Sequence, residues 1–193
     1  MASVVQMCNS ALNQLGAASI TSLTDNSKNA RLCNERYETI RDAVFRSHPW
    51  NSLIKRQQLA QDTATPAWGF KYQFTLPSDS LRVLAIDAYN SDYKVEGRKI
   101  LSNESTIKLI YVSTITDPNE MDVLLRETIS AALAADLAYS ITANLQVSGL
   151  MAEKYQAKLS EARHSDASEG YNTDPRNGNT DQVISEDFIN SRY

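Results

Sequence analysis

The chain has few of the residues from which catalytic and metal sites are commonly built: its 193 residues include two histidines, two cysteines and six glycines. The glycines lie far apart and none is followed by Lys-Ser or Lys-Thr, so a phosphate-binding loop is not expected. Cys8, Cys33, His48 and His164 lack the close paired spacing of zinc ligands. We therefore expect no metal ion, no cofactor and no NTPase activity.

The same residues have simpler structural roles. Cys8 and Cys33 fall inside helical patterns rather than in a disulfide-dense framework, which predicts reduced thiols in the core. His48 and His164 lie near the ends of expected helices. We expect His48 to interact with the helix dipole or to pack beside Trp50 rather than to act in catalysis.

Excess positive charge and long apolar runs are also absent. The formal net charge is −4 and like charges do not form blocks, so a basic surface for gripping nucleic acid is not expected. No stretch approaches the roughly 18 apolar residues that span a bilayer. The beginning Met1-Ala2-Ser3 lacks the basic and apolar regions of a signal peptide. We expect neither secretion nor contact with a membrane.

Two helices are expected in the first quarter of the chain. Apolar residues recur every three or four positions from Val4 to Leu15, and Gly16 follows at the position of a left-handed cap. A second stripe from Ala30 to Val44 predicts a helix over about residues 26–47. This helix must end there, because a proline at position 49 disfavours helical geometry in the residue before it.

The middle of the chain changes to the two-residue period of strands. Aromatic residues alternate with others from Trp68 to Phe74, and Leu76-Pro77-Ser78-Asp79 follows as a turn. Four short apolar runs, separated by residues typical of turns, cover 81–89, 93–95, 99–101 and 107–111. The pattern predicts four or five antiparallel strands.

Helical periodicity returns after Asp117-Pro118, which is a helix-start signal. It predicts helices over 123–139 and 147–167, the first with small residues that let another helix approach closely. The fold class predicted is α+β, with a four-helix core from residues 1–48 and 118–167 and a central antiparallel β-rich insertion over 49–117. The extended tail, 168–193, is expected to be flexible or ordered by a partner.

Certain residues are expected to anchor this architecture or to contact partners. Trp50 and Trp68 each offer a large apolar area that could fix the insertion to the helices, and Pro49 and Pro77 mark its boundary and first turn. The polar tail carries an isolated set of apolar residues that would gain nothing in a monomer. These candidate partner contacts are Val183, Ile184, Phe188, Ile189 and Tyr193.

Other functions remain open at this stage. Carboxylates such as Glu96, Glu104 and Glu120 could in principle hydrolyse a glycoside, as in a virion-associated enzyme that degrades the cell wall, but acidic residues are common on any surface. Aromatics interleaved with Lys71 would suit single-stranded nucleic acid, yet an ordinary half-buried strand has the same pattern. A chaperone or completion factor for particle assembly is a third possibility. We expect no catalytic residues and no enzyme.

Several short motifs occur in a recognisable order over roughly residues 1 to 170. They are Arg46-Ser47-His48-Pro49-Trp50-Asn51, then Arg56 and Leu59, then Tyr72-Gln73-Phe74-Thr75-Leu76-Pro77-Ser78-Asp79-Ser80-Leu81-Arg82-Val83, then Leu133-Ala134-Ala135-Asp136-Leu137-Ala138, and Tyr155. In this order they resemble the tail tubular protein A family, the head-to-tail adaptor subunits of short-tailed bacteriophages. The family has no signature catalytic residues.

The resemblance implies a homo-oligomeric ring, a dodecamer, stacked between the portal protein at the capsid vertex and the tail nozzle protein. Tail fibres are a further candidate partner, and DNA would pass through the centre without specific binding. The protein would be made in the host cytoplasm and would reside in the virion tail. The mild acidity agrees with such a passage, because each phosphate neutralised by Lys or Arg would add affinity and slow ejection.

Overall fold

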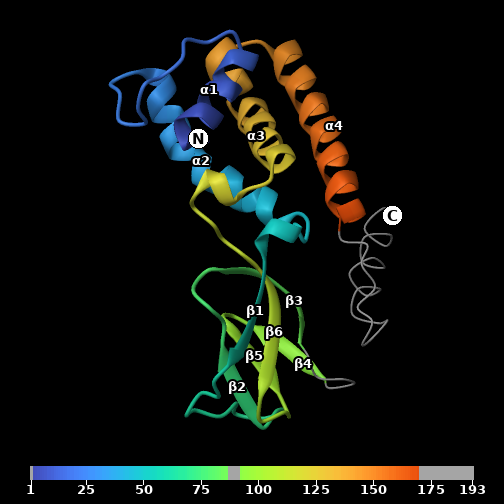
Figure 1. The fold of residues 1–193 in the computed structure, drawn as a ribbon. Helices are drawn as coiled ribbons and strands as arrows, with labels where there is room; N and C mark the ends of the chain where they lie inside the picture. The colour runs from blue at the N-terminus through green and yellow to red at the C-terminus, as the bar shows by residue number, and fades with distance from the viewer. Residues whose placement is uncertain (1, 87–91, 170–193) are drawn as a thin grey trace. The chain divides into compact units, whose positions relative to one another are not determined.

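The computed structural model describes residues 2–86 and 92–169, which form a mixed helical and β-sheet fold (Figure 1). Four α-helices and two antiparallel three-stranded sheets lie within these residues, as an α+β class requires. Contacts divide the chain into a discontinuous helical unit, Met1–Ser52 with Ile115–Tyr193, and a β-rich unit, Leu53–Thr114. The predicted boundaries, after residues 48 and 117, lie four and three positions from these. None of the described helices combines the length and the apolar character that crossing a bilayer requires.

The first two helices begin and end at clear local signals. Helix α1, Val4–Gln14, starts with a capping box in which Ser3 and Gln6 exchange hydrogen bonds between side chain and backbone. Gly16 follows with a φ of 66°, as predicted for a left-handed cap. Helix α2, Lys28–Arg46, starts where the Ser27 hydroxyl accepts a hydrogen bond from an amide three residues on, and ends before Pro49 as expected.

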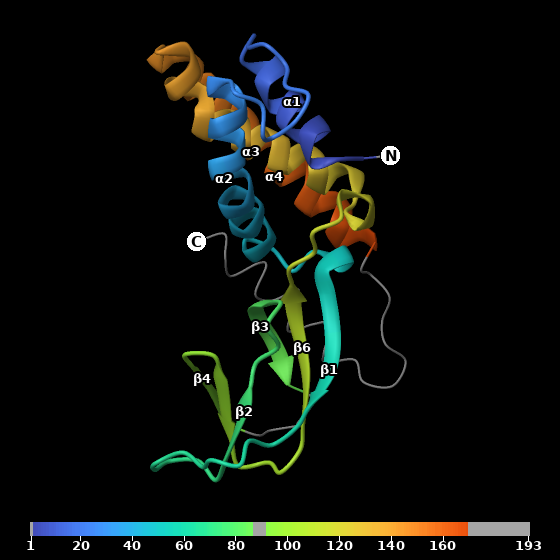
Figure 2. The same ribbon diagram turned by 90° about the vertical axis from the view of Figure 1, so that its left-hand side faces the viewer.

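Helix α3, Val123–Thr142, contacts each of the other three helices (Figure 2). The carboxylate of Asp122 accepts hydrogen bonds from two amides of its first turn, and Ala143 ends it in a left-handed conformation with a φ of 51°. Asp117, the predicted start signal, instead caps a single 3-10 turn, Pro118–Glu120. Buried residues occupy most faces of α3, which is typical of a helix surrounded by others.

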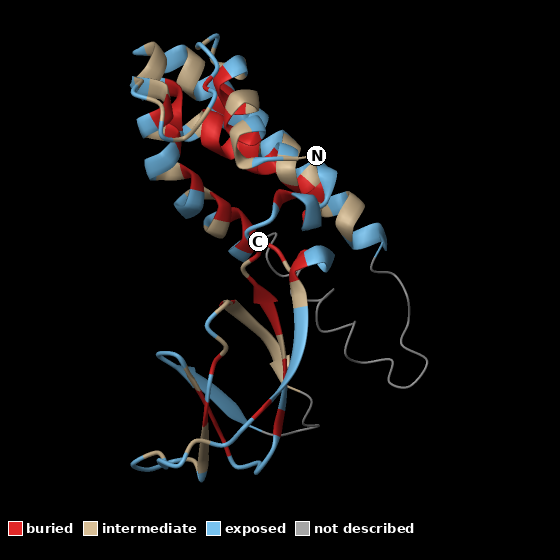
Figure 3. Cartoon of the chain, turned by 60° about the vertical axis from the view of Figure 1, so that its left-hand side comes forward, coloured by how far each residue is buried: buried red, intermediate tan, exposed pale blue. Residues whose placement is uncertain are grey.

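Helix α4, Leu145–Glu169, buries much less of its surface. Its fully buried residues, Met151, Leu159 and Ala162, form one narrow stripe, and the residues between them are exposed or half-buried (Figure 3). This stripe packs on α3. The sequence prediction placed this helix correctly and was short by two residues at each end.

The β-rich unit holds six strands in the described residues, more than the four or five predicted. The first sheet has the order β1-β6-β3, formed by β1 Ile54–Leu59, β6 Ile107–Ser113 and β3 Ser80–Ile86. The second has the order β2-β5-β4, formed by β2 Tyr72–Thr75, β5 Lys99–Ser102 and β4 Tyr93–Glu96. All pairs are antiparallel, and β4 and β5 are joined by a two-residue turn at Gly97, whose φ is 60°.

Both sheets contribute to one apolar core. Its buried members are Leu59, Phe74, Leu76, Ile100, Ile107, Leu109 and Tyr111. Residues at alternate positions of β6, Ile107, Leu109 and Tyr111, point into this core, as the two-residue period of a strand requires. The turn at Pro77 is held by its carbonyl, which accepts hydrogen bonds from the amide of Ser80 and the guanidinium of Arg98.

Two expectations for this unit are wrong. The strand predicted from Trp68 to Phe74 begins only at Tyr72, and Gly69 interrupts the extended backbone with a φ of 87°. Trp68 is 86% exposed, so it cannot anchor the unit by burial as proposed. The strand β1 was not predicted, because its sequence Ile-Lys-Arg-Gln-Gln-Leu has apolar residues only at its two ends.

Candidate functional site at the ends of helices α2 and α4

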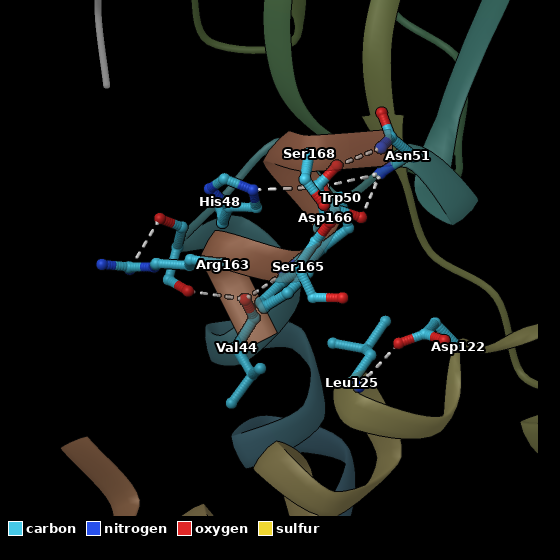
Figure 4. A network of polar contacts seen from close by, with 11 residues as sticks. Val44, His48, Trp50, Asn51, Asp122, Leu125, Arg163, Ser165, Asp166 and Ser168 are labelled. Atoms are coloured by element: carbon cyan, nitrogen blue, oxygen red, sulfur yellow. Dashed lines mark hydrogen bonds and ion pairs between the residues drawn. The ribbon is translucent and has the colours of Figure 1, made fainter. Parts of the chain in front are cut away.

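The residues that follow α2 form a compact polar cluster with the last turns of α4 (Figure 4). The motif His48-Pro49-Trp50-Asn51 supplies one side of this cluster. Asp166 of α4 supplies the other and lies between His48 and Asn51 in Figure 4. All of these residues belong to the helical unit. We call this set the α2–α4 joint.

Trp50 is the apolar centre of the joint. It is 1% exposed, and its indole Nε1 donates a 3.0 Å hydrogen bond to the carbonyl of Val44. That carbonyl also accepts hydrogen bonds from the amide and the hydroxyl of Ser47, so three donors converge on one carbonyl in the last turn of α2. The imidazole of His48 packs edge-on against the indole with ring centroids 4.8 Å apart, which confirms the predicted packing.

Asp166 connects this motif to α4. Its carboxylate lies 3.1 Å from Nε2 of His48 and accepts the amide proton of Asn51 at 3.0 Å. The side-chain amide of Asn51 donates in return to the Asp166 carbonyl at 2.7 Å. The side chains of His48 and Asp166 are only 6% and 11% exposed, whereas Asn51 is exposed. The charge-assisted bond of His48 therefore lies in a drier environment than the bonds of Asn51, which are near the surface.

Arg163, one turn before Asp166, adds a further link. Its Nη2 donates to the carbonyl of Ser47 at 3.0 Å, while its Nε is buried without a hydrogen-bond partner among the described residues. Burial lowers the pKa of the Arg163 guanidinium, an effect that the nearby Tyr155 opposes. The backbone after α2 is therefore tied to α4 by two side chains.

A histidine beside an aspartate can serve hydrolysis only if it also activates a nucleophile. The hydroxyl groups of Ser47 and Ser168 donate instead to the carbonyls of Val44 and Ser165, at 2.8 and 2.7 Å. His48 is itself 5% exposed, which leaves little access for a substrate. The hydrogen bonds of His48, Asn51, Arg163 and Asp166 thus tie the end of α2 to the last turns of α4.

Each unit also has a hollow elsewhere among its described residues. The hollow of the helical unit measures about 550 Å³ and lies where α1, α3 and α4 meet, lined largely by amide side chains together with Glu127, Lys154 and Lys158. The hollow of the β-rich unit measures about 830 Å³ and includes Lys55 and Asp79. Neither contains a pair of acidic groups arranged for hydrolysis.

Asp79 is already neutralised within its hollow. Lys55 donates to one carboxylate oxygen at 2.8 Å and the Tyr111 hydroxyl to the other at 3.1 Å. Burial tends to raise the pKa of Asp79, but these two hydrogen bonds and the lysine charge outweigh it and lower the pKa. Burial and the adjacent carboxylate raise the pKa of Tyr111 to about 12. Lys55, Asp79 and Tyr111 therefore satisfy one another within this hollow.

The described residues contain no group of three or more His, Cys, Asp or Glu side chains that could hold a metal ion. Cys8 and Cys33 are free, fully buried thiols, as predicted. A hydrogen bond with Cys33, together with burial, raises the pKa of Cys8 above that of an ordinary thiol. The same hydrogen bond lowers the pKa of Cys33, but both thiols are 0% exposed and belong to the core.

The remaining sequence-based candidates have mixed outcomes. Pro49 and Pro77 are half-buried at the positions where α2 and β2 give way to turns. Glu96, Glu104 and Glu120 are all exposed. The proposed partner contacts in the tail, Val183, Ile184, Phe188, Ile189 and Tyr193, lie outside the described residues.

Sequence reasoning identified His48, Trp50 and Asn51 through their motif but missed Asp166 and Arg163. Both are polar residues in a helix whose last turns are mostly polar, so no periodicity marks them. No protein-family model matches the chain, and no curated protein sequence matches it significantly.

Proposed function

We propose that the chain is a structural head-to-tail adaptor subunit of a tailed bacteriophage. Twelve copies would form a ring between the portal protein and the tail nozzle, with DNA passing through the centre. The observation that most supports this proposal is the ordered set of motifs resembling the tail tubular protein A family. Its most distinctive element, His48 to Asn51, ties the end of α2 to α4 through hydrogen bonds, as a structural role would require.

The proposal includes a finer arrangement of the fold. We propose that the four helices form a single core around α3 and that the β-rich unit is an insertion between α2 and α3. The contacts of α3 with α1, α2 and α4 support such a core. A bidentate ion pair between Arg36 of α2 and Asp136 of α3, with distances of 2.8 and 2.9 Å, supports it further. The helices would build the wall of the ring, and the sheets and tail would contact the portal and nozzle.

The charge of the chain agrees with a passage for DNA. A net charge of −4 provides little attraction for phosphates, so the ring would not retain DNA by counterion release. Several ionic groups are also paired within the described residues, as in the pairs Arg41–Asp42 and Lys55–Asp79. A structural subunit needs stable surfaces for its neighbours rather than reactive groups.

Assembly with a portal ring tests the proposal directly. The full chain, mixed with the portal protein of the particle that encodes it, should form a complex with twelve adaptor copies in native mass spectrometry. Electron microscopy of the mixture should show a second ring stacked on the portal. A chain that stays monomeric and never joins the portal ring would contradict the proposal.

The enzyme alternative is distinguished in a separate experiment. A zymogram on peptidoglycan should show no clearing by the wild-type chain. Clearing that is lost in Glu96→Gln or in Glu120→Gln would favour a cell-wall-degrading enzyme and overturn the structural assignment.

A further inference from the structure

The strand β4 is unusual because none of its four residues is buried. It lies at one end of the second sheet and, among residues 2–86 and 92–169, pairs with β5 alone (Figure 1). Tyr93 and Val95 are 36% and 45% exposed on one face, and Lys94 and Glu96 are exposed on the other. The end strand of a sheet has a row of amide and carbonyl groups available for another strand. The feature therefore suggests an attachment point for extended chain.

The sheet register shows what an added strand would extend. One row of apolar side chains runs across the second sheet, from Phe74 of β2 through Ile100 of β5 to Val95 of β4. Phe74 and Ile100 are 0% exposed, whereas Val95, at the end of the row, is 45% exposed. On the opposite face, Lys99 lies beside Glu96. An apolar residue placed next to Val95 would continue the first row, and a cation placed next to Glu96 would continue the second.

The sequence of β4 itself meets both requirements. If two copies of Tyr93-Lys94-Val95-Glu96 pair antiparallel with Val95 at the centre, Val95 lies opposite Val95 and Lys94 lies opposite Glu96 of the other copy, twice. Neither Lys94 nor Glu96 forms a hydrogen bond or ion pair with its side chain in the described residues. We propose that β4 is a self-complementary docking edge through which two copies of this chain pair about a two-fold axis at Val95.

This pairing goes beyond the proposed ring and does not depend on it. A two-fold contact uses the same patch on both copies and therefore closes on itself, whereas a ring requires two different patches on each subunit. The β4 pair is thus a state of the free subunit. The joined sheet is small, so the association is weak, with a dissociation constant on the order of 10 µM to 1 mM.

Charge reversal tests the proposed register. Sedimentation of the full chain over micromolar to millimolar concentrations should show a dimer. Lys94→Glu and Glu96→Lys should each weaken it by about tenfold or more, because two attractive cross-strand pairs become repulsive. A 1:1 mixture of the two variants should dimerise like wild type, since each heterodimer restores both pairs. The double variant K94E/E96K should also be restored.

Several outcomes would overturn the proposal. These are a wild-type chain that stays monomeric at about 1 mM, a Lys94→Glu variant that associates as well as wild type, and a mixture that fails to associate. Glu96→Lys also places two lysines side by side within the chain, at positions 96 and 99, so thermal melting must show that it folds. If Glu96→Lys does not fold, sedimentation of Lys94→Glu and the crosslinking of Val95→Cys described below test the contact without it. Ring formation with the portal by a wild-type chain that stays monomeric on its own would support the proposed function and refute this contact.

Crosslinking tests the position of the axis. Residues directly opposite each other in antiparallel strands have Cβ atoms about 4.5–5.5 Å apart, so Val95→Cys should crosslink to dimers with a short bismaleimide. Cys8 and Cys33 are 0% exposed and should not react in the folded chain. Val123→Cys is a matched control, because Val123 is 59% exposed at the start of α3. Equal crosslinking of the two variants would exclude a contact centred on β4.

Discussion

Replacing Asp166 with alanine should destabilise the helical unit, because the α2–α4 joint depends on its carboxylate. The substitution leaves the amide of Asn51 and the imidazole of His48 without the acceptor they have at 3.0 and 3.1 Å. A hydrogen bond to a charged group contributes about 1.5–3 kcal/mol net, and water can partly replace the carboxylate at a site near the surface. We therefore expect a loss of about 2–4 kcal/mol in the free energy of unfolding, and a melting temperature lower by roughly 5–15 °C for a chain of this size.

The assay can follow the joint itself. In a Trp68→Phe background the emission comes from Trp50, which is 1% exposed and should shift to longer wavelength if the joint opens. Urea unfolding followed by circular dichroism and by this emission gives the free energy of unfolding. Asp166→Asn keeps one acceptor oxygen and should recover part of the loss. Glu153→Ala, an exposed acid of the same helix, should change stability by less than about 0.5 kcal/mol. An Asp166→Ala variant as stable as this control would refute the reasoning.

Three further predictions follow from burial and charge. Trp50→Ala should cost about 3–5 kcal/mol by leaving a cavity, whereas Trp68→Ala should cost less than about 0.5 kcal/mol; chemical denaturation measures both. Burial raises the pKa of Tyr37 to about 12. The neutral phenol therefore contributes at most about 2–3 kcal/mol to the free energy of unfolding, and this contribution is complete below pH 10 and is lost between pH 10 and 12. Absorbance at 295 nm should report the ionisation, and the melting temperature should fall over the same pH range. The hydrogen bond from Lys99 lowers the pKa of Asp62, so the free energy of unfolding should fall as the pH drops below about 4. Lys99→Met removes this hydrogen bond and should make the melting temperature less dependent on pH in that range.

The helices were largely predictable because their signals are local. Helical periodicity and end signals such as Gly16 and Pro49 placed all four within a few residues of their observed ends. Asp117 was predicted to start the third helix, but it caps the 3-10 turn that precedes α3, and Asp122 caps α3 itself. Where a capping side chain and an apolar stripe agree, the sequence is sufficient.

The sheets and the joint depend on partners far away in the chain. The polar strand β1 exists because it pairs with β6, some 50 residues later, and nothing in its own pattern indicates this. Asp166 becomes significant only when the fold brings it to Asn51, 115 positions earlier. The expectation for Trp68 failed because an aromatic residue in an alternating pattern is not always buried. Such features require long-range contacts that periodicity does not encode.

The contacts of α3 with both N-terminal helices determine the order in which the protein can fold on the ribosome. Helices α1 and α2 are made first, but their apolar faces cannot be covered until α3 has been synthesised. The 62 residues from Leu53 to Thr114 come between them, which takes roughly 3–12 s at typical rates of translation. The β-rich unit has its own core and can fold during this interval. The first helices to leave the ribosome are therefore among the last parts of the chain to be buried. During that delay their apolar faces are exposed, which is the kind of surface that chaperones bind.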